Sequence, residues 1–496
     1  MEFNFDLQRL LNLFLYDRQA PMIFNSGFFL FFFLVFLYFY IKLRKNNSYR
    51  IIYLIACSCY FYYKSSGIYF LIMLFVTVWD FYLAQRMSAT ENRSKRKLML
   101  LLSIAANLGL LGYFKYTNFF GEIFCTLTAK DFSRFDIFLP VGISFFIFQS
   151  MSYTIDVYRK QLQPLDRIGD YAFFISFFPM LVAGPIIRAK DFIPQIRKPL
   201  FVSSEMFGKG IFLIIAGLFK KAVISDYISV NFVDRVFDNP NLYSGVENLL
   251  GLYGYALQIY CDFSGYSDLA IGIAMLLGFN VAANFKSPYQ SASITEFWRR
   301  WHISLSSWLR DYLYISLGGN RKGKIRTYVN LIITMLLGGL WHGPSLRFVC
   351  WGLMHGLALA IHKLAMTLFP ALKPSGSVMK PLWRVLGTVF TFHLVCFSWI
   401  FFRAENFEIA TSMIKQIFTF FHSEIFVDLL AAYPMVFFVM IVGYILHFVP
   451  ARLENRLIDI TVKMPLMWKA AALTVTIVFI MQIKSSEILS FIYFQF

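Results

Sequence analysis

The residue whose context most clearly suggests chemistry is His342, which follows an apolar run over residues 329–340. It stands in the stretch GGLWHGPS (338–345), where glycines let other backbone or a ligand approach closely and Pro344 cannot continue helical hydrogen bonding. Burial among apolar groups would favour the neutral imidazole, which is the form that accepts a proton at neutral pH. The ring would then have the property that a general base requires.

Four further histidines, His302, His355, His362 and His393, lie in or near apolar segments. In a helical bundle such a ring is more often a hydrogen-bonded packing residue than a catalyst. His355 and His362 are seven residues apart, about 10.5 Å along a helix axis, which is too far for joint metal ligation. The sequence also has no HExxH, paired-cysteine, GxSxG, P-loop or dinucleotide motif, so we expect no metal site and no bound cofactor.

A second group of candidates consists of polar side chains within apolar stretches. They are Gln149, Tyr153, Asp156, Asp262, Ser264 and Asp268. The first three are spaced i, i+4 and i+7 and therefore share one helix face. Because ionisable groups inside a membrane are costly, they indicate functional sites. The alternative is that the carboxylates cap helix ends or tie helices together through hydrogen bonds.

The composition is that of a polytopic membrane protein. Of its 496 residues, 58% are hydrophobic and only 15% are charged, whereas soluble domains have roughly 45–50% and about 25%. Apolar stretches that could be embedded in a bilayer recur along the chain, and they predict an all-α protein with about 10–13 membrane-embedded helices. One bundle can absorb the whole length, so we expect a single membrane domain over residues 1–496.

Basic loops set the expected orientation. The net charge of +18 could suggest nucleic acid, but Lys and Arg collect in loops such as 42–50 and 86–97. Loops of this kind lie on the cytoplasmic side and meet anionic lipid, so we expect lipid contacts, no nucleic acid and an extracytoplasmic N-terminus. Residues 171–187 end in a Gly-Pro break and are followed by another basic stretch. They therefore predict a re-entrant element.

The longest polar interruption spans residues 284–328 and contains eight Lys or Arg against two acidic residues. Apolar and aromatic residues repeat at helical spacing over 294–312. Ser293 and Glu296 have the spacing of a capping box, which would start a helix. This segment is predicted to be an amphipathic interfacial helix followed by a basic loop.

Three stretches, at 255–280, 293–321 and 338–356, closely resemble the membrane-bound O-acyltransferase family. The resemblance is to its bacterial branch, which contains the alginate O-acetyltransferase membrane subunit and the teichoic-acid D-alanyl transfer protein. It extends from about residue 20 to the end of the chain. It implies a helical fold enclosing a central tunnel between a cytoplasmic donor site and an extracytoplasmic acceptor site.

The same resemblance implies roles for individual residues. The histidine of the WHG motif, essential to acyl transfer in this family, matches His342, and a second histidine some 40 residues upstream matches His302. The acyl donor would be a thioester, either acetyl-CoA or an acylated carrier protein. Basic side chains could bind its phosphates or acidic surface, or could be plain positive-inside charge. They are Arg299, Arg300, Arg310, Arg321 and Lys322.

The resemblance also implies a cellular location for the protein and an acceptor for the acyl group. The protein would lie in a bacterial cytoplasmic (inner) membrane and supply acetyl groups for an extracytoplasmic polysaccharide such as alginate. An extracytoplasmic acetyltransferase partner with a serine nucleophile would complete the transfer. Peptidoglycan O-acetylation and D-alanyl transfer to teichoic acid are alternatives. A transporter without covalent chemistry, or a scaffold for a partner enzyme, would be a different class.

The chain ends in an aromatic tail over residues 485–496, with FIYFQF as its last six residues. Such a terminus normally anchors in the membrane interface or packs against a partner. In the family branch that the chain resembles, a similar terminal motif is linked to acyl relay. Tyr493 is therefore a candidate for carrying the acyl group before a partner receives it.

Overall fold

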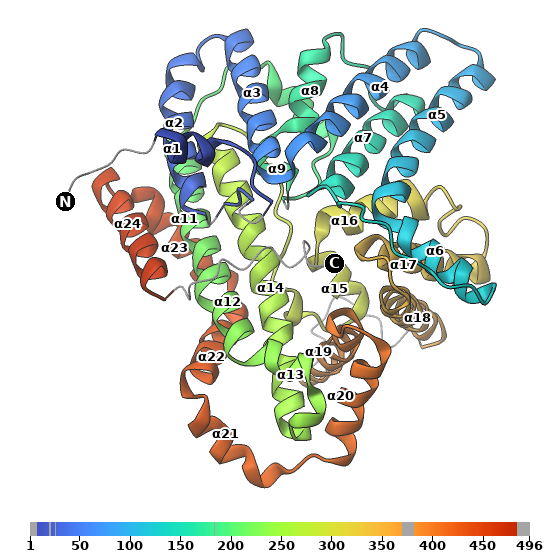
Figure 1. Ribbon diagram of the computed structural model, residues 1–496, viewed down its shortest axis with the longest axis vertical. Helices are drawn as coiled ribbons and strands as arrows, with labels where there is room; N and C mark the ends of the chain where they lie inside the picture. Colours follow the sequence, from blue (N-terminus) through green and yellow to red (C-terminus); the bar gives the residue numbers. More distant parts are fainter. Residues whose placement is uncertain (1–6, 19–20, 25, 183, 370–380, 484–496) are drawn as a thin grey trace. The chain divides into compact units, whose positions relative to one another are not determined.

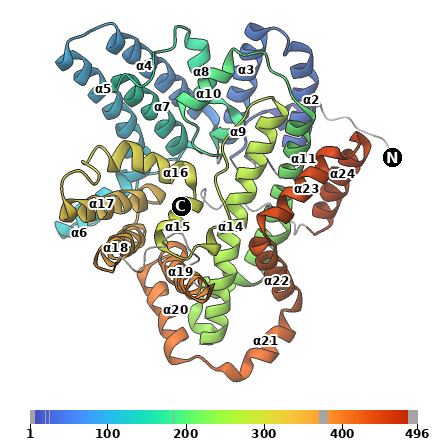
Figure 2. The same cartoon turned by 180° about the vertical axis from the view of Figure 1, so that it is seen from behind.

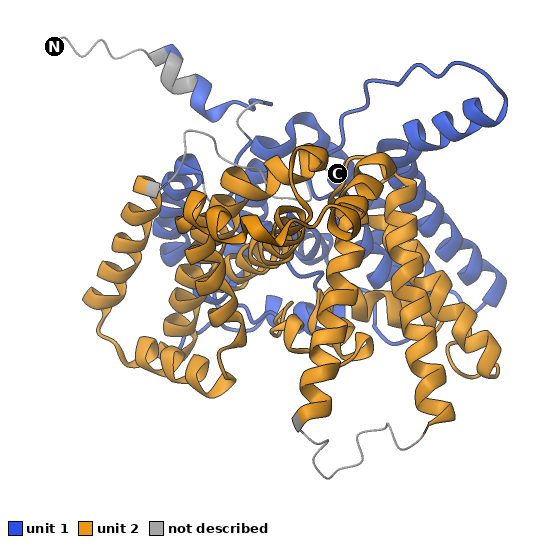
Figure 3. Cartoon of the chain, turned by 90° about the horizontal axis from the view of Figure 1, so that it is seen from below, with its two compact units in different colours: residues 1–203, 273–281 blue, residues 204–272, 282–496 orange. Residues whose placement is uncertain are grey.

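The computed structural model describes residues 7–18, 21–24, 26–182, 184–369 and 381–483 (Figures 1 and 2). Within these ranges all regular secondary structure is helical and no strand occurs, which confirms the all-α prediction. The chain divides into two compact units, coloured separately in Figure 3. The first unit consists of residues 1–203 and 273–281, and the second of residues 204–272 and 282–496. The single domain expected from the sequence stays a prediction.

Several helical stretches have the length and composition to cross a bilayer. Four do so alone, Asn47–Ser88, Arg93–Leu127, Leu346–Leu368 and Leu382–Arg403. Two more helix pairs, bent by 96° and 119°, raise the number to six if each pair is one span. The second helix of each pair begins at or next to a proline, which cannot donate to the preceding turn. Gly27–Leu43 is a shorter apolar helix and is not among these six.

The first unit is a bundle held together in its interior by polar contacts. Its helices are α1 (Leu7–Phe14), α2 (Gly27–Leu43), α3 (Asn47–Ser66), α4 (Phe70–Ser88), α5 (Arg93–Leu111), α6 (Thr117–Leu127), α7 (Ile143–Tyr158), α8 (Ile168–Ser176), α9 (Phe178–Leu181) and α10 (Ala189–Ile196). Asp80 of α4 is fully buried and accepts hydrogen bonds from Asn107 of α5 at 2.6 Å and Ser150 of α7 at 2.5 Å. Polar contacts of this kind fasten helices whose surfaces are otherwise apolar.

The segment predicted to be re-entrant is broken at Phe177, which lies before its Gly184-Pro185 sequence, and again after Leu181. Helix α8 ends at Ser176, and Phe177 has a ψ of 99°, which is outside the helical range. The short helix α9 follows, with Pro179 at its start, and it ends at Leu181. Helix geometry resumes only at α10, after Arg188. The side of the membrane to which this segment returns stays a prediction.

The second unit contains both histidines of the expected site. Its helices are α11 (Ser204–Leu218), α12 (Asp226–Ile228), α13 (Asp234–Asp238), most of α14 (Gly245–Leu276), α15 (Ile294–Arg300), α16 (Ile303–Trp308), α17 (Lys324–His342), α18 (Leu346–Leu368), α19 (Pro381–Arg403), α20 (Phe407–Thr419), α21 (Phe426–Ala432), α22 (Pro434–Phe448), α23 (Ala451–Lys463) and α24 (Leu466–Ile483).

Helices α17 and α18 pack with their backbones in contact. A Cβ atom added at Gly339 would lie 2.1 Å from the carbonyl oxygen of Phe348, and one at Gly352 would lie 2.3 Å from that of Met335. Only glycine permits so close an approach. The two glycines therefore set the spacing of the helix pair that carries His342.

Candidate active site

His342 is the last residue of α17, where the helix was expected to stop. Gly343, its C-terminal neighbour, is extended (φ −162°, ψ 153°), so the helical hydrogen-bond pattern ends there. The imidazole is 3% exposed. Its centroid lies 5.0 Å from Trp341, 5.1 Å from Trp351 and 5.3 Å from Phe402. Rings from α17, α18 and α19 thus surround a buried imidazole.

Two arginines form polar contacts at the C-terminal end of α19, the helix that contributes Phe402 to this cluster. The Arg347 guanidinium on α18 donates to the carbonyl oxygens of Phe401 at 3.3 Å and Phe402 at 3.4 Å. Arg403 pairs with Asp234 at 2.7 Å. Cations at a helix C-terminus satisfy its last carbonyls and favour its dipole. The sequence analysis missed these residues, although arginines at the ends of apolar runs were a visible signal.

The continuous helix predicted over 293–312 is wrong at two residues, Trp301, which is extended (φ −97°, ψ 128°), and His302. His302 has left-handed backbone angles (φ 42°, ψ 56°) and separates α15 from α16. The cause is a non-local contact, because the N–H of Ile303 donates to the carbonyl oxygen of Asn284 at 2.9 Å instead of continuing the helix. A non-glycine residue in this conformation costs roughly 1–2 kcal/mol, and such strain clusters at functional sites.

The apolar face predicted for this segment is confirmed. All eight of its members are buried, namely Ile294, Phe297, Trp298, Trp301, Leu305, Trp308, Leu309 and Tyr312. The helix start predicted at Ser293 is also confirmed, since Ser293 is the N-cap of α15 and its side chain accepts from the N–H of Glu296 at 3.2 Å. The reciprocal bond of a capping box is displaced by one residue, because the Glu296 carboxylate accepts from the N–H of Ala292. Burial of these rings therefore positions the segment despite the break at His302.

The two histidines of the expected site, His302 and His342, both pack against the indole ring of Trp341. The Trp341 centroid lies 6.2 Å from that of His302 and 5.0 Å from that of His342. The His302 ring is fully buried and also packs edge-on against Phe263, at 4.6 Å. The structure thus brings His302 and His342 into one aromatic cluster.

The other membrane-segment histidines have partners typical of packing residues. His355 accepts from the indole N–H of Trp298 at 3.3 Å through Nδ1, and its Nε2 lies 2.9 Å from the Ser398 hydroxyl. His362 Nδ1 lies 2.9 Å from the Thr295 hydroxyl. The nitrogens of His393 contact the Val389 carbonyl at 2.8 Å and the Tyr253 hydroxyl at 2.9 Å.

Asp262 of α14 pairs with a buried lysine that the sequence analysis missed. Its carboxylate contacts Lys221, which also pairs with Asp226 at 2.8 Å. The side chains of Asp262 and Lys221 are each 3% exposed. Lys221 lies in a π-helical segment, Phe219–Ser225, that continues α11. The signal was a pair of lysines inside an apolar run, which indicates buried charges with partners.

Asp268 is held in the same way, by Lys220 at 2.7 Å. Ser264 lies between the two carboxylates in sequence and is 1% exposed. Both carboxylates thus tie α14 to the π-helical segment, as the alternative interpretation of these residues stated. Their predicted place in a tunnel stays a prediction.

The Lys221–Asp262 pair allows a test of whether this carboxylate is structural. Lys221→Met leaves the carboxylate buried without its cation, so we expect the free energy of unfolding to fall by about 3–5 kcal/mol. Adding Asp262→Leu should restore part of the loss, because both charges of the more deeply buried pair are then gone and only Asp226, whose side chain is 19% exposed, lacks its cation. The measurement is the apparent Tm of the purified full-length protein in detergent. Losses that simply add in the double variant would contradict the buried pair.

Gln149 and Tyr153 lie on α7 in the first unit, where each has a backbone partner. The Gln149 side-chain amide donates to the Phe174 carbonyl oxygen, and the Tyr153 hydroxyl accepts from the N–H of Leu165 at 2.9 Å. These contacts tie α7 to α8 and to the connection between them. The role of both residues in a tunnel stays a prediction.

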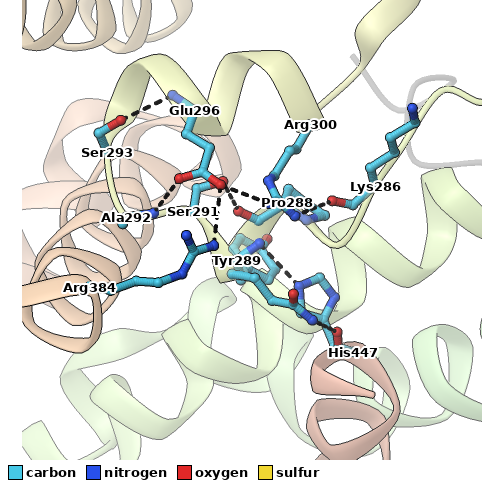
Figure 4. A network of polar contacts seen from close by, with 11 residues as sticks. Lys286, Pro288, Tyr289, Ser291, Ala292, Ser293, Glu296, Arg300, Arg384 and His447 are labelled. Carbon is cyan, nitrogen blue, oxygen red and sulfur yellow. Dashed lines mark hydrogen bonds and ion pairs between the residues drawn. The ribbon is translucent and has the colours of Figure 1, made fainter. Parts of the chain in front are cut away.

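Of the five basic candidates, four have exposed side chains, namely Arg299, Arg310, Arg321 and Lys322. Arg310 pairs with Asp311 at 2.7 Å, and this hydrogen bond raises the pKa of the guanidinium, which stays charged. The fifth, Arg300, is half-buried and pairs with Glu296 at 2.8 Å (Figure 4). Arginine and lysine are the side chains that bind a phosphate or an acidic surface.

Glu296 is the centre of the contacts drawn in Figure 4. Its carboxylate accepts from the N–H of Ala292 at 3.0 Å and pairs with Arg300, and Arg384 of α19 lies 3.7 Å away. Nearby, the N–H of Tyr289 donates to Nε2 of His447 at 3.0 Å. These contacts anchor the chain that leads into His302.

Comparison with known proteins gives a consistent class for this helical membrane protein. The family model described as membrane-bound O-acyltransferase matches residues 157–402, which include both histidines of the cluster. A probable alginate O-acetylase (AlgI) of Pseudomonas putida is 42% identical over 405 residues, which are 80% of this chain and 81% of the relative. A peptidoglycan O-acetyltransferase of Helicobacter pylori is 35% identical over 431 residues, 80% of each protein.

A more distant relative is the teichoic acid D-alanyltransferase of Bacillus subtilis, 29% identical over 286 residues, which are 54% of this chain and 69% of that protein. The chain belongs to the membrane-bound O-acyltransferase family. It is an acyltransferase of the membrane, with its aromatic histidine cluster inside the segment that the family model matches.

Proposed function

We propose that the protein takes an acetyl group from a cytoplasmic thioester and passes it across the membrane for O-acetylation of a polysaccharide of the alginate type. The observation that carries this proposal is the buried pair of His342 and His302 around Trp341. It lies in a chain that matches alginate O-acetylases over most of its length. A peptidoglycan acceptor is the second candidate, supported by the Helicobacter pylori relative.

His342 carries the chemistry in this proposal. It takes the proton of the attacking hydroxyl, whose oxygen then bonds to the thioester carbonyl carbon. The carbon–sulfur bond breaks, and the imidazolium returns the proton to the thiolate. His302 orients the reacting groups. The aromatic rings around both histidines exclude water, which would otherwise hydrolyse the thioester.

The donor is acetyl-CoA or an acylated carrier protein, docked at the cytoplasmic side by Arg299, Arg300, Arg310, Arg321 and Lys322. No cofactor stays bound to the protein. An extracytoplasmic acetyltransferase with a serine nucleophile receives the acyl group and passes it to the polymer. The protein lies in a bacterial cytoplasmic membrane with its N-terminus outside. D-alanyl transfer to teichoic acid is a weaker candidate, because that relative is more distant.

The test uses purified full-length protein in detergent with labelled acetyl-CoA, or with an acetylated carrier protein, as the donor. We expect thiol release from one of the two donors at a rate proportional to the amount of enzyme. A transporter would leave both thioesters intact. Labelled D-alanyl carrier protein serves as a third donor, and turnover of that donor alone would replace acetyl by D-alanyl in the proposal.

Tyr493 lies outside the described residues, and its relay role is a proposal from the sequence. Tyr493→Phe keeps the ring and removes the hydroxyl, so we expect acylation of the polymer to be lost while donor binding is retained. The measurement is the acetyl content of the polymer made by cells that express the variant at the wild-type level. Normal acetylation by Tyr493→Phe would mean that this hydroxyl carries no acyl group.

A further inference from the structure

Asn284 makes a set of contacts that the proposed function has not yet used. It lies in the connection between α14 and α15 and is 1% exposed. Its side-chain oxygen accepts from the backbone N–H of Ser304 at 3.1 Å and from the Ser304 hydroxyl at 2.9 Å, and it lies 3.2 Å from Nδ1 of His302. The amide nitrogen donates to Ser267 on α14, at 3.3 Å.

The backbone N–H of Ser304 decides which way this amide points. A flipped amide would place its NH₂ group against that N–H, donor against donor. The oxygen of Asn284 must therefore face Ser304, and with it His302.

That orientation fixes the proton on the His302 ring. The Ser304 hydroxyl also lies 3.4 Å from Nδ1, but its single hydrogen points to the nearer oxygen of Asn284, at 2.9 Å. Because an amide oxygen only accepts hydrogen bonds, Nδ1 carries the hydrogen of the neutral ring, and the lone pair is on Nε2. Within the described part of the chain, Nε2 is buried and has no hydrogen-bond partner. Buried polar atoms are almost always paired, so an orphaned acceptor indicates a site for a donor from outside the protein.

The backbone of Asn284 also holds His302 in place. The carbonyl oxygen of Asn284 accepts from the N–H of Ile303 at 2.9 Å, at the left-handed break in which His302 stands. Both the main chain and the side chain of Asn284 thus hold His302, and Phe263 and Trp341 limit rotation of its ring.

We propose that Asn284 is a positioning residue that holds His302 as its Nδ1-protonated tautomer, so that Nε2 accepts a hydrogen bond from a donor group of the bound substrate other than the hydroxyl whose proton His342 takes. This inference rests on the proposed function for its last step. The tautomer itself is a property of the resting protein. Ser304 supports it by supplying the N–H that orients the amide.

The first test reads the tautomer without any acyl transfer. Histidines of the full-length protein are labelled with ¹⁵N, and a His302→Gln variant identifies the His302 signal among the seven histidines. We expect a protonated Nδ1 and an unprotonated Nε2 in the wild type. Asn284→Leu, which lacks the acceptor, should shift the population toward the other tautomer, whereas Asn284→Asp should keep the proton on Nδ1.

Asn248 supplies a matched control. It is a fully buried asparagine of the second unit whose side chain donates to the carbonyls of Pro240, Tyr243 and Ser244. Asn248→Leu should lower stability and leave the His302 signal unchanged. A wild-type His302 with its proton on Nε2, or an Asn284→Leu variant with an unchanged tautomer, would overturn the proposal.

The second test reads turnover. Asn284→Leu should lower kcat by about 10- to 100-fold per folded molecule, the range seen when hydrogen-bond partners that orient metal-ligating histidines are removed, with the donor KM unchanged. Asn284→Asp should restore most of it. An Asn284→Leu variant with wild-type kcat would overturn the positioning role. If the wild type itself consumes no thioester, the proposed function fails while the tautomer result still stands.

Discussion

His342→Gln is expected to lower thioester turnover by about 10²- to 10⁴-fold, the range that a general acid–base group contributes. Glutamine approximates the size of the ring and can form hydrogen bonds, but it cannot exchange a proton at neutral pH. The side chain is buried among Trp341, Trp351 and Phe402, so the loss should appear in kcat, not in donor binding. The measurement is thiol release from the labelled donor, per folded molecule.

The matched control is His393→Gln on α19. That histidine is exposed and bonded to Val389 and Tyr253, with contacts typical of packing, so its replacement should leave turnover near the wild-type value. Equal losses in the two variants would indicate a general effect on folding. Full turnover by His342→Gln would remove His342 from the chemistry and favour a scaffold role for the protein.

Gly339→Ala is expected to have a large effect on stability, although it adds a single methyl group. The new Cβ would lie 2.1 Å from the Phe348 carbonyl oxygen and 3.1 Å from the Cα of Gly352. These neighbours are backbone atoms, so α17 and α18 must move apart, at a cost of about 3 kcal/mol or more. Since small residues allow close packing of membrane helices, we expect little folded protein at 37 °C.

The readout for Gly339→Ala is the fraction of full-length protein that stays monodisperse after heating in detergent. Gly109→Ala on α5 is the control, because a Cβ at that position has no atom within 4 Å apart from its chain neighbours and the nearby backbone of its own helix. Alanine there should be neutral or stabilise the helix by roughly 0.5–1 kcal/mol. Equal melting temperatures for the two variants would contradict the contact between α17 and α18.

The features that local sequence determines were predictable. The length of an apolar run and the glycines and proline after it predicted that a helix would stop at His342, and α17 ends there. Helical spacing of aromatic residues predicted the buried face over 294–312. The serine at 293 predicted the start of α15. In each case residues close in sequence determine where the helix starts, stops or buries its face. A short window of sequence was therefore sufficient for the prediction.

The features that distant contacts determine were not predictable. The break at His302 depends on Asn284, which is 18 residues away in sequence and competes for the N–H of Ile303. The ion pair of Asp262 depends on Lys221, from another helix and 41 residues earlier. Spacing along one helix cannot reveal such partners, because they are set by which helices pack together. The roles of the site residues remain predictions that the variants above test.

The central claim is that acyl groups leave a thioester at the cytoplasmic face while the donor stays behind. Inside-out vesicles of the native membrane expose that face, so labelled acetyl-CoA or labelled acetylated carrier protein is added outside and the polymer is recovered from the lumen. With one of the two donors we predict acetyl label in the polymer, the free thiol of the donor outside, and neither product with His342→Gln. Intact thioester inside the vesicles, or undiminished pools of both thioesters outside, would contradict the account.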